Sequence, residues 1–105
     1  MNGKRHGRGH IIEYNEYNEK ILECECLNGI KNGYGKEYNF QGEIIFMGEY
    51  LNGQRNGKGK VYDGGDLTFE GEYLNEKKNG KGNLYITINK NLCRIEGVYL
   101  NGEIL

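Results

Sequence analysis

A phrase of the form Leu-Asn-Gly-x-x-x-Gly-x-Gly returns along this 105-residue chain at an almost constant interval. It begins at Leu27 and at Leu51, and again at Leu74, where Glu76 stands in place of the first glycine. These leucines are 24 and 23 residues apart, and Leu100 opens a shortened copy 26 residues later. A period in this range is typical of arrays that stack one small structural unit on the next. Such arrays usually bind a partner along a surface, and few of them are catalysts.

One unit of the repeat reads as a β-hairpin followed by a turn. In the copy over 51–73, Asn and Gly residues indicate turns, and alternation of apolar with polar residues indicates strands. We expect a turn over 52–57 and a short strand over 58–62. A second turn over 63–66 then leads into a second strand over 67–74. Strict alternation along this strand places Tyr62 on the opposite face from Gly57 and Gly59. A β-bulge, whose position the sequence does not define, would bring them to the same face.

Glycines flanked by aromatic residues recur on the second strand of the units. A Gly inside a strand costs stability, so something must need the space that a side chain would fill. We expect a Tyr or Phe ring from the adjacent strand to lie across each bare stretch of backbone. Stacked hairpins would then build a continuous aromatic ladder as the core, because an isolated hairpin is marginal in water. The candidate aromatic face, concave and open to a partner, comprises Phe46, Tyr50, Phe69, Tyr73 and Tyr99.

The chain contains three cysteines. Cys24 and Cys26 take the places of the Gly and the Tyr in the first, degenerate copy. They are two positions apart on a predicted strand, so their side chains run parallel with backbones about 6.6 Å apart, which does not suit a disulfide. With Cys93 as the odd third cysteine, we expect reduced, buried thiols.

The spacing of the repeated residues resembles the MORN repeat. Gly48 to Tyr62 reads Gly-Glu-Tyr-Leu-Asn-Gly-x-x-x-Gly-x-Gly-x-x-Tyr, and Gly71 to Tyr85 repeats it with Glu76 in place of the turn glycine. The match from Gly33 through Gly59 is also good. Val98 departs from the usual Glu, and the first copy and the two ends match poorly. The resemblance covers nearly the whole chain.

This resemblance implies an all-β fold, namely an elongated, twisted antiparallel sheet of stacked β-hairpins with one hairpin per repeat. We expect a single domain over 1–105, divided into a degenerate repeat, three full repeats and a partial repeat: 1–26, 27–50, 51–73, 74–99 and 100–105. The motif carries no catalytic residue, so the resemblance implies that the chain is not an enzyme and needs no cofactor. MORN modules are known as binders of membrane phospholipid, as self-associating scaffolds and as accessory modules of larger proteins.

The net charge is only −1, but the charges are unevenly distributed. The turn-plus-glycine segments hold 11 of the 14 Lys and Arg residues and a single acid, Glu76; they are 2–10, 28–36, 52–60 and 75–83. Equivalent turns of a stacked array lie along one edge, so these residues predict a basic stripe. Its candidate residues for an anionic partner are Arg55, Lys58, Lys60, Lys77, Lys78 and Lys81, with Lys4, Arg5, Arg8, Lys31 and Lys36 continuing it. Alternatively, the lysines only keep exposed turns soluble and support the sheet by cross-strand charge pairs.

Other chemistry fits the sequence less well. Gly-x-Gly beside Lys also occurs in phosphate-binding loops, but those need a following helix and a Gly-Lys-Ser/Thr ending, and this chain has no Ser. The acids at 63–66 lack the spacing and the closing Glu of a calcium loop. A zinc site from His6, His10, Cys24 and Cys26 is disfavoured because Cys-x-Cys fans out poorly for tetrahedral ligation. A Cys–His dyad would need a pocket that a thin sheet does not offer. We therefore expect no metal.

The favoured function is a non-catalytic scaffold that binds another protein or itself within a larger assembly, through the aromatic face or the open sheet edges. One alternative is peripheral binding of anionic phospholipid membranes through the basic stripe, where each Lys or Arg contributes about 1 kcal/mol. Another is docking to a nucleoprotein complex, although these tyrosines are better explained as core than as bases' stacking partners. No signal peptide or apolar span is visible. We expect a cytoplasmic location, or a peripheral one at a membrane or cytoskeletal structure.

Overall fold

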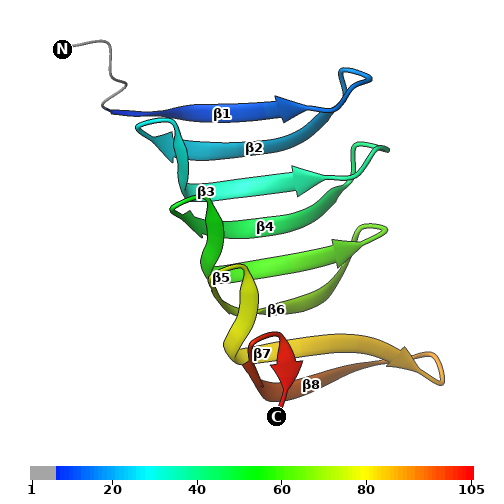
Figure 1. The fold of residues 1–105 in the computed structure, drawn as a ribbon. Helices are drawn as coiled ribbons and strands as arrows, with labels where there is room; N and C mark the ends of the chain where they lie inside the picture. The colour runs from blue at the N-terminus through cyan, green and yellow to red at the C-terminus, as the bar shows by residue number, and fades with distance from the viewer. Residues whose placement is uncertain (1–6) are drawn as a thin grey trace.

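The computed structural model describes residues 7–105, and within that range it is one open antiparallel sheet of nine strands. Consecutive strands are neighbours throughout, so the chain zigzags from one end of the sheet to the other (Figure 1). The strands are β1 (Arg8–Tyr14), β2 (Lys20–Leu27), β3 (Ile30–Tyr38), β4 (Ile44–Leu51), β5 (Gln54–Asp63), β6 (Asp66–Leu74), β7 (Lys77–Ile88), β8 (Asn91–Leu100) and β9 (Glu103–Ile104). The described part has no helix, and its longest extent is 59 Å against 31 and 17 Å. The predicted all-β, elongated array of hairpins is confirmed.

The turns that connect one hairpin to the next consist of two residues each. Asn52 and Gly53 have φ of 52° and 85°, and the turns at 28–29, 75–76 and 101–102 also have positive φ at both residues. Two successive positive φ values are the signature of a type I′ turn, which suits the twist of the flanking strands. The prediction of a turn over 52–57 was therefore wrong in its second half, because two residues suffice and β5 already begins at Gln54.

These turns stack on one another along one side of the sheet, which we call the turn edge. The Gly53 N–H donates to the Lys31 carbonyl at 3.0 Å, and the Glu76 N–H donates to the Arg55 carbonyl at 2.9 Å. The Gly102 N–H continues the series with a 2.8 Å bond to the carbonyl of Lys78. Equivalent turns therefore do line up on one edge, as the period predicts (Figure 1).

A wide β-bulge follows the turns at 28–29, 52–53 and 75–76, where two hairpins meet. At the β4–β5 junction Gly48 pairs with Gly59 and Tyr50 with Arg55, so Glu49 alone faces the three residues 56–58. Gly57 adopts a φ of 106° there, a conformation that L side chains rarely adopt. Figure 1 shows the result: the first residues of β3, β5 and β7 curl along the left side before the strands enter the sheet.

The carboxylate of Glu49 holds this bulge in place. It accepts the N–H of Lys58 at 2.6 Å and occupies the space where a side chain on Gly57 would lie. Glu25 and Glu72 make the same bond to the N–H groups of Tyr34 and Lys81, at 2.6 and 2.7 Å. The Glu in the repeated Gly-Glu-Tyr phrase thus has a structural role that the sequence pattern alone did not reveal.

The expected irregularity near Tyr62 is present, although Tyr62 stays on the face opposite Gly59. Gly59 and Val61 face the core, and the tyrosines at this register stay on the opposite face. Tyr38 and Tyr85 there donate their hydroxyls to Glu23 and Glu70 respectively. The register of β5 against β6 shifts between Val61 and Tyr62, and that of β3 against β4 shifts between Glu37 and Tyr38, but the shifts do not bring Tyr38 into the core.

The core is one thin layer of rings lying over glycines. Phe46 contacts Tyr73 edge to face with ring centroids 5.4 Å apart, and Phe69 contacts Tyr99 in the same way at 5.2 Å. A Cβ placed on Gly59 would lie 2.7 Å from the Phe46 ring and 3.0 Å from Tyr73. Real Cβ atoms do not approach so closely, so the rings need a bare backbone, as predicted. The buried residues are Leu22, Cys24, Cys26, Phe46, Tyr50, Phe69, Tyr73 and Tyr99.

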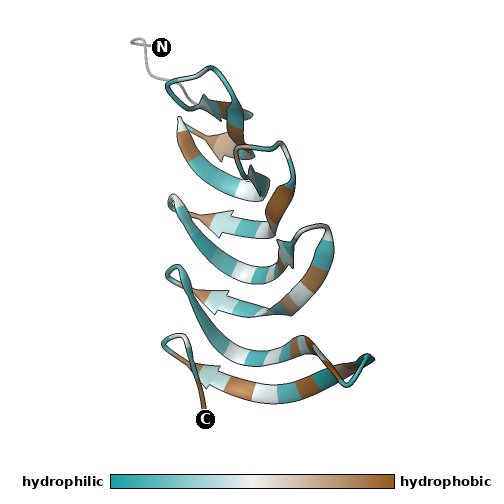
Figure 2. Cartoon of the chain, turned by 90° about the vertical axis from the view of Figure 1, so that its right-hand side faces the viewer, coloured by the Kyte–Doolittle hydropathy of each residue, from teal (hydrophilic) through white to brown (hydrophobic). Residues whose placement is uncertain are grey.

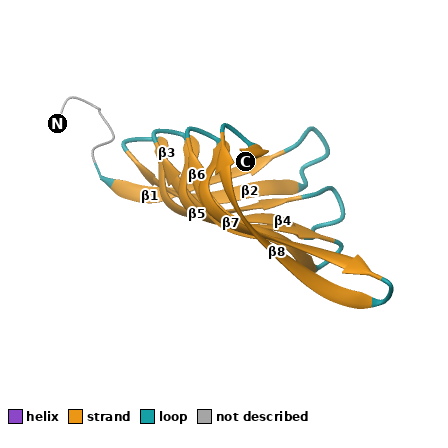
Figure 3. Ribbon diagram, turned by 90° about the horizontal axis from the view of Figure 1, so that it is seen from below, coloured by secondary structure: helices purple, strands orange, loops and turns teal. Residues whose placement is uncertain are grey.

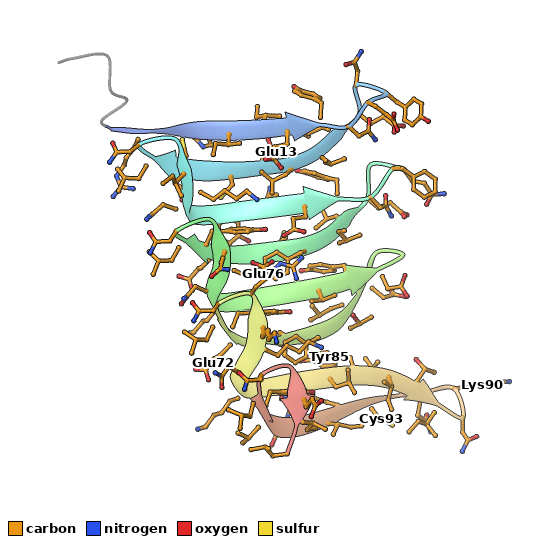
Figure 4. All side chains as sticks on the ribbon, viewed as in Figure 1. Glu13, Glu72, Glu76, Tyr85, Lys90 and Cys93 are labelled. Carbon is orange, nitrogen blue, oxygen red and sulfur yellow. The ribbon has the colours of Figure 1, made fainter. Side chains whose placement is uncertain are left out.

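The cysteines follow the prediction only in part. Cys24 and Cys26 are free thiols and are buried in this core. Cys93 is also free, but it is only half-buried because it lies on β8, toward the far end of the last hairpin (Figure 4). The expectation that all three thiols are buried was wrong for Cys93.

The glycine–ring contact predicts a difference in stability between alanine variants at two glycines of the repeated phrase. Gly59→Ala should lower the free energy of unfolding by about 2 kcal/mol, since an added methyl overpacks the ring layer. Gly9 corresponds to Gly59 in the repeated phrase, but it pairs with Cys26 instead of a glycine, and its Cβ would meet the Cys26 sulfur at an ordinary 3.5 Å. Gly9→Ala should therefore leave stability unchanged within about 0.5 kcal/mol. Urea unfolding of both variants checks this, and equal losses would contradict the packing argument.

Candidate functional site

The face of the sheet opposite the rings, which we call the polar face, carries charges that alternate from strand to strand. Lys58 and Lys60 on β5 lie directly opposite Glu72 and Glu70 on β6. In the middle of this face, acids come from even-numbered strands and bases from odd-numbered ones, because the repeat places Glu on the second strand of each hairpin and Lys on the first; Arg94 on β8 departs from this order. Along each strand, hydrophilic and hydrophobic positions alternate, as the colours of Figure 2 show.

A shallow groove of about 950 Å³ runs across the polar face from β3 to β8. Its floor includes the backbone of the glycine row, whose missing side chains would point toward the ring face; the row comprises Gly48, Gly59, Gly71 and Gly82. The charged side chains that line it are Glu49, Lys58, Lys60, Glu70, Glu72, Lys81 and Glu96. Bases and acids are therefore mixed along its length, and the groove is not a basic surface.

The structure divides the predicted basic stripe between two faces. Lys58, Lys60 and Lys81 lie on the polar face and are exposed. Arg55 and Lys78 lie on the ring face instead, where the curled strand starts carry them over the core. Lys77 is exposed beside the turn edge. Arg8, Lys31 and Lys36 fall within the described residues, whereas Lys4 and Arg5 fall outside them, as does His6 of the disfavoured zinc set.

Two cations of the stripe cover aromatic rings. The guanidinium carbon of Arg55 is 4.0 Å from the centroid of Phe46, and the ammonium of Lys78 is 4.1 Å from that of Phe69. Lys31, at the same repeat position, lies 5.7 Å from the ring of Tyr50. A cation over a ring face is attracted by the ring quadrupole, and its aliphatic stem shields the ring from water. These residues therefore belong to the core as well as to the charge pattern.

The candidate aromatic face is not available to a partner. Phe46 and Phe69 are each 1% exposed, and Tyr50, Tyr73 and Tyr99 are also buried. The expectation that a partner contacts these five rings is corrected here. A single-layer sheet has no second layer to cover its rings, so they pack on one another beneath the curled strand starts.

A polar cluster that the sequence analysis missed lies at the middle of the ring face. The Arg55 guanidinium donates to both carboxylate oxygens of Glu37, at 2.8 and 3.0 Å, and the Tyr50 hydroxyl donates to the same carboxylate. Glu76, labelled in Figure 4, accepts the backbone N–H of Arg55 at 2.8 Å and lies 3.6 Å from its side chain.

A signal for this cluster does exist in the sequence. At the position of Glu37 the two later full copies have Val61 and Leu84, and at the position of Arg55 the two neighbouring full copies have Lys31 and Lys78. Among the three full copies, an acid in place of an apolar residue and an arginine in place of a lysine are two departures that compensate each other. Arg rather than Lys suits a bidentate bond to a carboxylate.

The cluster changes the acidity of its members. Burial alone raises the pKa of the Glu37 carboxyl, but hydrogen bonds from Arg55 and Tyr50, together with the Arg55 charge, outweigh it and hold that pKa below 4.5. Burial and the bond to Glu37 raise the pKa of the Tyr50 hydroxyl. On the polar face, partial burial and the Glu23 carboxylate raise the pKa of Tyr38 to about 12. Glu37 therefore remains ionised and Tyr50 protonated through the neutral range.

The fold and these surfaces define an open, single-layer array of β-hairpins. No protein-family model matches the chain, and no curated protein matches it. Within residues 7–105, no three His, Cys, Asp or Glu side chains come close enough together to hold a metal ion. The same part of the chain has no helix long and apolar enough to cross a membrane.

The Glu37 cluster predicts a pH dependence of stability. A folded-state pKa below 4.5 means that this carboxylate stabilises the fold above that pH, and that the contribution is lost as the pH falls through the folded value. Glu37→Gln should lower the free energy of unfolding at pH 7 by about 1–2 kcal/mol, and the difference between variant and wild type should shrink as the pH falls below 4.5. Urea unfolding from pH 3 to 7 measures this. The exposed Glu16→Gln is the control, and a constant gap at every pH would refute the assignment.

Proposed function

We propose that this chain is a non-catalytic, MORN-like scaffold module that binds another protein through the polar face of its sheet. The observation that carries the proposal is the pair of alternating charge rows on an extended, uncovered face. Lys60 opposite Glu70 and Lys58 opposite Glu72 form the centre of these rows. A folded protein surface can present the complementary order of charges at fixed spacing, and such complementarity supplies specificity.

The mixture of charges favours a protein over an anionic membrane. The groove lining contains three lysines and four glutamates, so a uniformly negative surface would meet more repulsion than attraction there. Two further cations of the stripe, Arg55 and Lys78, lie over rings on the opposite face. A nucleic acid backbone is also uniformly negative and meets the same objection.

A charge swap tests whether a partner recognises the order of the charges. Lys60→Glu combined with Glu70→Lys keeps the net charge and the cross-strand pair but reverses their order. The partner is first captured from lysate and identified, and its affinity for each purified variant is then measured by calorimetry. We expect the swap to weaken binding at least about tenfold, because like charges then face each other across the interface.

Lys77→Glu is the matched control for this swap. It changes the net charge by two without altering the polar face, since Lys77 lies beside the turn edge. The proposal expects this variant to bind its partner normally. Membrane binding would show the opposite pattern in flotation with phosphatidylserine vesicles, with the swap tolerated and Lys77→Glu weakened. That result would overturn the proposal and favour the phospholipid alternative.

A further inference from the structure

The polar face carries two rows of side chains that cross the sheet from β3 to β8, one on each side of the glycine row. The row nearer the turn edge, which we call the proximal row, consists in strand order of Tyr34, Glu49, Lys58, Glu72, Lys81 and Val98. The other, which we call the distal row, consists of Lys36, Met47, Lys60, Glu70, Asn83 and Glu96. Each row therefore has three members on either side of the boundary between β5 and β6.

The uncharged members of the two rows lie symmetrically about this boundary. In the proximal row they are the two ends, Tyr34 on β3 and Val98 on β8, which are 48% and 49% exposed. In the distal row they are Met47 on β4 and Asn83 on β7. A half turn about the boundary thus exchanges uncharged residues with uncharged residues, and it exchanges every lysine of the rows with a glutamate.

We propose that the polar face binds the polar face of a second copy of this chain, related to the first by a two-fold axis that runs parallel to the strands between β5 and β6. This inference rests on the proposed function and names its partner. The rotation places β5 over β6 of the second copy, β4 over its β7 and β3 over its β8. The pairs that then face each other are Lys58 with Glu72, Glu49 with Lys81, Lys60 with Glu70, Lys36 with Glu96, Tyr34 with Val98, and Met47 with Asn83.

The charges select this orientation over the other face-to-face arrangement with two-fold symmetry. An axis that crosses the strands would place each strand over the same strand of the second copy. Lys58 and Lys60 of β5 would then face lysines, and the glutamates of β6 would face glutamates. Like charges that face each other disfavour an arrangement, whereas opposite charges fix its register.

The charged groups of the two rows remain available to a second copy. Within residues 7–105, no ion pair engages the lysines of the rows, which are Lys36, Lys58, Lys60 and Lys81. Glu49 and Glu72 accept a backbone N–H with one carboxylate oxygen each, and both side chains are exposed. The other oxygen of each carboxylate can therefore accept a bond from a lysine of the second copy.

The dimensions of the face predict a weak dimer. Two sheets that pack face to face lie about 10 Å apart with their strands nearly aligned, a gap that a lysine and a glutamate can bridge from opposite sides. The strands from β3 to β8 span about 24 Å, which is small for a protein interface. We therefore expect a dissociation constant on the order of 0.1 mM.

Charge reversal at Lys36 and Glu96 tests the contact between copies. Lys36→Glu brings two acids together across the interface and Glu96→Lys brings two bases together, so each should weaken dimerisation at least about tenfold in analytical ultracentrifugation. An equimolar mixture of these two variants should regain wild-type association, as should the double variant by itself. The two residues are five strands, about 24 Å, apart in one chain, so this rescue can arise only between copies.

Lys90→Glu is the matched control, because it makes the same change of charge as Lys36→Glu outside the two rows. Lys90 lies in the turn between β7 and β8, whose hairpin extends beyond the others (Figure 3), so this variant should associate like the wild type. If Lys36→Glu does not fold, Lys60→Glu and Glu70→Lys replace the two reversals.

Three outcomes would overturn the inference: a wild type that is still monomeric near about 1 mM, a wild type that assembles beyond a dimer, or reversals that do not rescue each other. The proposed function fails separately, if a captured protein other than this chain binds the Lys60/Glu70 swap as tightly as the wild type.

Discussion

The packing of rings over glycines is the contact on which the rest of this structure depends. A single-layer sheet has no opposing layer against which to bury side chains, and isolated hairpins are marginal in water. Here Phe46 and Tyr73 come from different hairpins and meet edge to face above Gly59. Each hairpin thereby buries its aromatic residues on the backbone of its neighbour, so the units stabilise one another through nearest-neighbour contacts.

The bulge at each junction links this core to the distribution of charge. Glu49 fixes the bulge by accepting the Lys58 N–H, and the bulge turns the start of β5 over the ring layer. Arg55 consequently reaches Phe46 and Glu37 on the ring face, while Lys58, three residues later, lies on the polar face. Residues that are neighbours in a basic segment thus have unrelated surroundings. Some cations complete the core, and only the others are free to contact a partner.

The sequence was sufficient to predict the architecture but not the faces on which individual charges lie. The period, the Asn-Gly turns and the alternation along 67–74 each reflect local rules, and together they predict a row of hairpins correctly. At a bulge, however, the two-residue alternation of side chains between the faces is interrupted. The bulge in turn depends on a carboxylate from the neighbouring strand. The placement of Arg55 and its bond to Glu37 therefore follow from a contact between repeats, which no single repeat reveals.

The same geometry restricts what a partner of the polar face must look like. Strands lie about 4.8 Å apart, so like charges on alternate strands recur about every 9.6 Å along the array. Another β-sheet whose alternate strands carry charge has this spacing, and a helix with charges seven residues apart, about 10.5 Å, comes close to it. A flexible acidic segment has no fixed spacing, and it would meet Glu70 and Glu72 as often as Lys58 and Lys60. The order of the charges, rather than their sum, is therefore what this face offers for recognition.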